Sequence, residues 1–63
     1  MNLNEIKKAV DNNENVYWSN KGYQVKKYNN DYYIVFSANQ NMIGLTWADN
    51  ITINGKEEDF FIN

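Results

Sequence analysis

Residues 32–37 read Tyr32-Tyr33-Ile34-Val35-Phe36-Ser37, and this most apolar stretch of the chain decides the fold. Its aromatic and β-branched residues predict a strand. Alternation along that strand places Tyr32, Ile34 and Phe36 on one face and Tyr33 and Val35 on the other. A strand that is apolar on both faces needs cover on both sides. The second face is therefore covered by the C-terminal segment, by curling of the sheet toward a barrel, or by another molecule.

On either side of this strand, period-two alternation predicts further strands. We expect them at residues 16–18, 23–28, 42–47, 51–53 and 60–62. Polar turns separate the strands at residues 19–22, 29–31 and 38–41. Gly22 is suited to a positive φ, and Asn54-Gly55 is typical of a hairpin turn. In the strand at 23–28, Gln24, Lys26 and Tyr28 lie opposite Tyr23 and Val25.

At the start of the chain, the apolar residues recur with a different period. Asn2 and Glu5 have the spacing of a capping box. The apolar residues that follow recur at helical spacing and predict a helix over residues 3–11, with Leu3, Ile6 and Val10 packed on the sheet. The sequence thus predicts a single α+β domain over residues 1–63. In it, a short N-terminal helix packs on a twisted antiparallel β-meander sheet of four to six strands.

Composition narrows the possible functions. The 63 residues include no Cys, no His and no Arg, and the formal net charge is −2. Disulfides and a thiolate zinc site are excluded, and we predict no metal and no cofactor. Small folds without disulfides depend on a partner subunit or on a core rich in large side chains. With no apolar run of about 20 residues and no signal-peptide layout, we expect a cytoplasmic protein that does not bind membranes.

No catalytic group can be assembled from the sequence. Ser19 and Ser37 have no His partner, so we expect the protein not to be an enzyme. Glu57, Glu58 and Asp59 are consecutive carboxylates, which do not converge on a cation as spaced ligands do. They are interpreted as a solvated acidic turn, or as an acidic rim that speeds docking to a basic protein surface.

The tyrosines offer a second kind of surface. Near Lys26 and Lys27, the rings of Tyr17, Tyr28 and Tyr33 are suited to stacking on the exposed bases of a single-stranded nucleic acid. The absence of Arg and the small number of lysines favour a protein partner instead. The residues that we predict to contact the partner are Tyr17, Lys26, Tyr28, Tyr33, Glu57, Glu58 and Asp59.

Most of the chain resembles a known group of proteins. The segments that carry the resemblance are residues 16–20, 22–25, 33–35, 43–49, 53–55 and 59–61, which include Val16-Tyr17-Trp18-Ser19-Asn20 and Ile43-Gly44-Leu45-Thr46-Trp47-Ala48-Asp49. They resemble small uncharacterised proteins encoded by bacteriophages and prophages. The resemblance implies a phage origin, an accessory role and action in the host cell cytoplasm. It brings no catalytic residue.

Together these features predict an accessory module that binds a host or phage protein, as an inhibitor of a host factor or host defence system. The alternatives are single-stranded nucleic-acid binding through the aromatic face, and a minor structural or assembly role in the virion. We also expect a homodimer. Without one, Tyr17, Tyr33, Val35 and Met42 would form an exposed apolar patch. A two-fold axis allows such a patch, or an edge strand, to pair with itself.

Overall fold

One helix precedes all the strands. The computed structural model describes residues 1–63, and α1 spans Leu3–Asp11, as predicted. The Asn2 side chain accepts the N–H of Glu5 at 2.8 Å, and the Glu5 carboxylate accepts the N–H of Asn2 at 2.9 Å. This capping box satisfies donors that the first turn of a helix leaves unpaired. It explains why α1 begins at Leu3.

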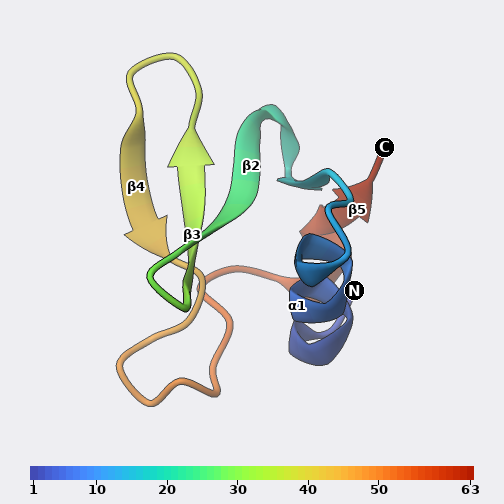
Figure 1. The fold of residues 1–63 in the computed structure, drawn as a ribbon, viewed down its shortest axis with the longest axis vertical. Coiled ribbons are helices and arrows are strands. Elements are labelled where there is room, and N and C mark those ends of the chain that lie inside the picture. Colours follow the sequence, from blue (N-terminus) through green and yellow to red (C-terminus); the bar gives the residue numbers. More distant parts are fainter.

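Five antiparallel strands form one open sheet. They are β1 (Val16–Trp18), β2 (Asn20–Tyr28), β3 (Asp31–Phe36), β4 (Asn41–Gly44) and β5 (Phe60–Ile62). Their order in the sheet is β4-β3-β2-β1-β5 (Figure 1). The α+β fold predicted from the sequence is confirmed. The first four strands form a meander, whereas β5 crosses back to pair with β1.

The position of β5 shows that the C-terminal segment does not cover the second face of the sheet. It extends the sheet in its plane as an edge strand and does not lie over either face. Because β4 and β5 form opposite edges and do not pair, the sheet does not close into a barrel. A short 3-10 helix, η1 (Glu57–Asp59), leads into β5. No helix in the structure has the length and apolar character needed to cross a membrane.

The first hairpin turn differs from the prediction. Ser19, not Gly22, has the positive φ, at 66°. The register of β1 against β2 shifts between Tyr17 and Trp18, and such an irregularity bends a strand without requiring glycine at the usual turn position. The second turn is as predicted. Asn29 and Asn30 adopt φ values of 50° and 70°, which asparagine tolerates better than most residues.

The segment between β4 and η1 is irregular, which corrects two predictions. The strand expected over residues 42–47 ends at Gly44, and residues 51–53 form no strand. Only an isolated bridge between Thr46 and Ile53 remains. The reason is local, because the Asp49 carboxylate accepts the backbone N–H groups of Ile51 and Thr52, both at 2.9 Å. Such side-chain bonds compete with a strand ladder for the same donors.

The predicted hairpin at Asn54-Gly55 is also wrong. Gly55 has a φ of +142°, and a Cβ added there would lie 2.7 Å from the indole Nε1 of Trp18. Glycine is therefore required by the close approach of the chain to Trp18, not by a two-residue turn between strands.

The core lies between α1 and the sheet. Its buried side chains are Ile6, Ala9, Val16, Val25, Ile34, Leu45 and Phe60. Ile6 is fully buried, while Leu3 and Val10 are half-buried beside the core. An aromatic ladder borders it on the same face, with ring centroids 4.8 Å apart for Phe36–Tyr23, 5.1 Å for Tyr23–Trp18 and 6.5 Å for Trp18–Phe60.

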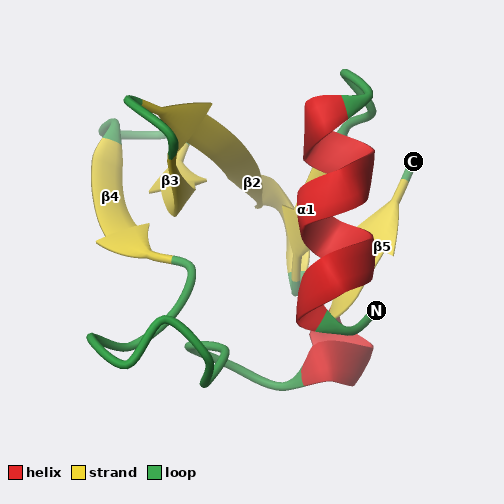
Figure 2. Ribbon diagram, turned by 60° about the horizontal axis from the view of Figure 1, so that its bottom comes forward, coloured by secondary structure: helices red, strands yellow, loops and turns green.

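The helix covers only part of its face of the sheet. It packs on β1 and β2, and Figure 2 shows it at the end of the sheet that carries β5, far from β4. Beyond the reach of α1, an apolar hollow remains near β4. It is lined by Tyr23, Ile34, Phe36, Asn41 and Ile43.

Candidate functional site

The face of the sheet opposite α1 is the candidate binding surface, and we call it the open face. One row of cross-strand pairs runs across all five strands from Met42 through Val35, Gln24 and Tyr17 to Phe61. A second row joins Gly44, Tyr33 and Lys26. Alternation adds Tyr28 beside Lys26. The open face therefore consists of Tyr17, Gln24, Lys26, Tyr28, Tyr33, Val35, Met42 and Phe61.

The aromatic residues on the open face occur in pairs. The ring centroids of Tyr28 and Tyr33 lie 6.1 Å apart, and those of Tyr17 and Phe61 lie 5.7 Å apart. Val35, between the two pairs, is 3% exposed, whereas Tyr28 is 43% exposed. The surface thus combines a packed centre with accessible tyrosines. Such rings bury a large area at low cost in conformational entropy when a partner docks.

Four of the predicted partner-binding residues are brought together here. Tyr17, Tyr28 and Tyr33 share the open face, and Lys26 lies directly across from Tyr33 in the register. The expected apolar patch of Tyr17, Tyr33, Val35 and Met42 also belongs to this face, but Val35 is buried in it and only Met42 is exposed. Residues 32–36 are therefore apolar on both faces because one face packs into the core and the other belongs to this surface.

Lys27 does not belong to the open face, although the sequence placed it with the tyrosines. Its Nζ lies 3.3 Å from Asp11 Oδ1 at the end of α1. The hydroxyl of Tyr32 donates to the same oxygen at 2.7 Å. The Nζ atoms of Lys7 and Lys27 each lie 5.3 Å from the centroid of the Tyr32 ring. These contacts form a polar clasp between α1 and the sheet, defined here as Lys7, Asp11, Lys27 and Tyr32.

The clasp perturbs the titration of its members. The hydrogen bond from Tyr32, followed by the contacts with Lys27, lowers the pKa of Asp11. The same hydrogen bond raises the pKa of Tyr32, because loss of the hydroxyl proton would leave two negatively charged oxygens in contact. The pKa of Lys27 is raised by its hydrogen bond to Asp11. All three groups therefore stay in their ordinary protonation states at neutral pH, which suits an anchoring role.

The acidic residues of the prediction lie elsewhere. Glu57 and Glu58 are exposed in η1, and Asp59 is half-exposed. The N-terminal amino group of Met1 donates to the Glu57 carbonyl at 2.8 Å, and the Asp59 carbonyl accepts the N–H of Ser19. Because η1 leads into β5, two strands separate it from the tyrosines of β3. The acidic residues thus border the β5 edge of the sheet and do not join Tyr28 and Tyr33.

Sequence reasoning missed two exposed apolar side chains in the loop after β4. Trp47 is 64% exposed and Ile51 is 76% exposed. The loop that carries them is internally bonded, since Trp47 donates its N–H to the Thr52 carbonyl at 2.9 Å and accepts the N–H of Asn50 at 2.9 Å. The side chain and the backbone of Thr52 both donate hydrogen bonds to the Asp49 carboxylate, and these bonds close the loop. The same bonds lower the pKa of Asp49. The Asp49–Thr52 spacing was the available signal for this turn.

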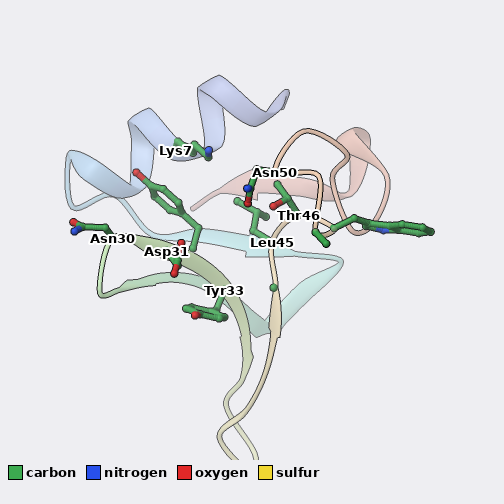
Figure 3. A pocket seen from close by; sticks show the side chains of 11 residues that line it. Lys7, Asn30, Asp31, Tyr33, Leu45, Thr46 and Asn50 are labelled. Atoms are coloured by element: carbon green, nitrogen blue, oxygen red, sulfur yellow. The ribbon is translucent and has the colours of Figure 1, made fainter.

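A shallow pocket lies between this loop, α1 and the β2–β3 turn. Figure 3 shows Lys7 approaching from the helix, Asn30 from the turn, Asp31 from the start of β3, and Thr46 and Asn50 from the loop. Tyr33 lies on the opposite side of β3 from Lys7. Asp31 is the one carboxylate among the lining residues. The lining of the pocket thus combines this carboxylate with one amine, that of Lys7.

Comparisons of the chain with protein-family models, with characterised proteins and with solved structures found no match.

Proposed function

We propose that this chain is an accessory protein-binding module, encoded by a bacteriophage or prophage, that inhibits a host factor or host defence system. The observation that carries the proposal is the open face, where apolar and tyrosine side chains from all five strands gather around a single cation, Lys26. The phage origin rests on the sequence resemblance. No catalytic role is included in the proposal.

The charge distribution supports a protein partner over a nucleic acid. A single-stranded nucleic acid needs several cations along its backbone, in addition to rings that stack on its bases. Lys26 meets this need on the open face, but Lys27 is turned to Asp11 on the other side of the sheet. Lys21 lies in the irregular part of β2, where the register against β1 shifts. The open face therefore offers aromatic anchors with little positive charge, as protein interfaces do.

A variant set with a matched control tests the proposal. The tagged chain is expressed in bacterial cells, and the captured proteins are compared for wild type, Tyr28→Ala, Tyr33→Ala and Ile51→Ala. We expect one protein to be recovered in fixed ratio to wild type, to survive nuclease treatment, and to be lost with either tyrosine variant. Ile51→Ala removes an exposed apolar side chain outside the open face and should retain it. Equal capture by all four proteins would refute the role of the open face.

Single-stranded nucleic-acid binding remains the second candidate, because Lys26 lies across from Tyr33 and beside Tyr28 on one surface. Its signature is salt dependence. Each phosphate contact contributes about −0.7 to the slope of log affinity against log salt for a single strand. Micromolar oligonucleotide binding at physiological salt, with a slope near −2 and lost in Lys26→Ala, would replace the protein-partner proposal. A salt-insensitive protein complex would exclude this second candidate.

A further inference from the structure

The two edges of the sheet differ in how they are protected against pairing with other strands. Exposed edges are commonly guarded by charged residues, proline or very short length. The β5 edge has three residues and is preceded by Glu57, Glu58 and Asp59. The β4 edge, Asn41–Gly44, has neither charge nor proline, and no charged residue occurs between Tyr32 and Ala48. Figure 1 shows no other element outside β4.

The backbone of β4 has donors and acceptors free for another strand. Leu45, which follows β4, donates its N–H to the Tyr32 carbonyl at 3.0 Å, so this residue faces β3. Because backbone groups alternate along a strand, those of Ile43 also face β3, and those of Met42 and Gly44 face outward. The Asn54 side-chain amide lies 3.4 Å from the Gly44 carbonyl, which leaves that oxygen room for a second donor.

The β4 side chains are apolar on both sides of this edge. Met42 is 51% exposed on the open face, and Ile43 is 48% exposed on the helix side, next to the hollow lined by Tyr23 and Phe36. A lone edge strand with two half-exposed apolar residues and free backbone groups is a template for pairing.

We infer that β4 pairs antiparallel with β4 of a second copy of this chain, about a two-fold axis beside Ile43. In this register each Met42 lies opposite Gly44 of the other copy, and the outward backbone groups of both residues are satisfied. The two Ile43 side chains meet on the helix side. Gly44 has no side chain on the open face, so Met42 of the other copy fills the space beside Tyr33. A large residue thus faces a vacant position, and the edge is complementary to itself.

Charge favours a second copy as the occupant of this edge. A two-fold axis brings each residue near its own counterpart, so any charged residue at the axis meets a like charge. In a chain of net charge −2, the uncharged residues 32–48 are the region where this repulsion is absent. At β5 the same operation would bring the acidic residues of η1 toward their counterparts. The inference does not depend on what the open face binds.

Sedimentation equilibrium at increasing protein concentration tests the inference, with one lysine substitution on each edge. Ile43→Lys and Ile62→Lys replace side chains of nearly equal exposure, 48% and 46%, on β4 and β5. We expect wild type and Ile62→Lys to be dimeric at micromolar concentrations, and Ile43→Lys to be a monomer with unchanged circular dichroism. Mixing Ile43→Lys with Ile43→Glu should restore a dimer, because opposite charges then meet at the axis.

Several outcomes would overturn the inference. If the wild-type chain stays monomeric at all concentrations, β4 does not pair with a second copy and the inference is wrong. A dimer that persists in Ile43→Lys, or that Ile62→Lys dissociates instead, uses another surface. If Ile43→Lys fails to fold, amide hydrogen exchange of the wild-type dimer gives the answer. The N–H groups of Met42 and Gly44 should be protected, and exchange at the rate of free amides would exclude pairing of β4.

Discussion

Replacing Gly55 by alanine tests whether the irregular segment after β4 is held against the aromatic ladder. The backbone of Gly55 has a φ of +142°, which side-chain-bearing residues rarely adopt. An added Cβ would lie 2.7 Å from Trp18 Nε1 and 3.3 Å from Trp18 Cε2. The indole has little freedom to retreat, since its centroid lies 5.1 Å from that of Tyr23 and 6.5 Å from that of Phe60.

The expected cost follows from these two features. Backbone strain in a region reserved for glycine costs roughly 1–3 kcal/mol, and overpacking against a fixed neighbour costs roughly 1–3 kcal/mol. Together these two contributions predict that Gly55→Ala lowers the free energy of unfolding by about 2–6 kcal/mol. At roughly 0.05–0.15 kcal/mol per residue, a chain of 63 residues has about 3–9 kcal/mol in total. The variant should therefore lose a large part of its stability.

Urea unfolding followed by far-ultraviolet circular dichroism measures this loss, with all proteins at one concentration because self-association changes apparent stability. Gly22→Ala is the matched control. Gly22 has no positive φ, and its added Cβ would meet the movable side-chain oxygen of Asn20 at 2.8 Å. It should cost about 1 kcal/mol, the size of the hydrogen bond to Asn20 that is displaced.

A double-mutant cycle separates the two causes. In a Trp18→Phe background the indole nitrogen is absent, so Gly55→Ala should cost at least roughly 0.5 kcal/mol less than in wild type, the smallest coupling that contacting residues show. The reasoning would be refuted if Gly55→Ala changed stability by less than about 0.5 kcal/mol, as an ordinary surface substitution does. It would also be refuted if Gly22→Ala cost as much.

Two further substitutions examine how α1 is held to the sheet. Ile6→Ala removes a fully buried side chain and should lower the free energy of unfolding by roughly 2–4 kcal/mol, whereas Lys8→Ala on the exposed side should change it by less than about 0.5 kcal/mol. A similar result for both would mean that α1 is not docked. Asp11 has a lowered pKa, chiefly through the hydrogen bond from Tyr32, so its stabilising effect is present above the ordinary carboxyl pKa near 4. It is lost as the pH falls through the lower folded-state pKa. Asp11→Asn should therefore flatten the acid side of the stability–pH curve, and an unchanged curve would contradict the clasp.

Much of the fold could be predicted because its signals are local. The capping box of Asn2 and Glu5 marks the start of α1, and two asparagines mark the β2–β3 turn. Period-two alternation correctly placed Tyr17, Lys26, Tyr28 and Tyr33 on strands whose register then brings them to one face. A face of a sheet can be inferred from sequence whenever neighbouring strands are joined by short turns, since such turns constrain the register.

The parts that could not be predicted depend on contacts between distant residues. Nothing local indicates that residues 60–62 return to β1, because that pairing joins residues 60–62 to residues 16–18, which are distant in the sequence. The glycine at position 55 follows a hairpin-like asparagine, yet it serves the close approach to Trp18. Alternation along β2 places Lys27 on the helix side of the sheet. Its ion pair with Asp11 at the end of α1, however, depends on how α1 packs on the sheet, which the local sequence does not show. The separation of Glu57 and Glu58 from the tyrosines has the same non-local origin.

The two proposed surfaces are compatible because they use different directions of the same sheet. Pairing at β4 extends the sheet in its plane, so it leaves the open face of each copy accessible except at Met42 and places the two faces side by side. Only 8 of 63 residues are buried in the single chain, and a core this small gains from a partner surface. Two linked faces would also bind a partner that presents two copies of its epitope with increased avidity, since the second contact becomes intramolecular. Ile43→Lys would then weaken capture of such a partner without altering any residue of the open face, whereas Tyr33→Ala would weaken it in monomer and dimer alike.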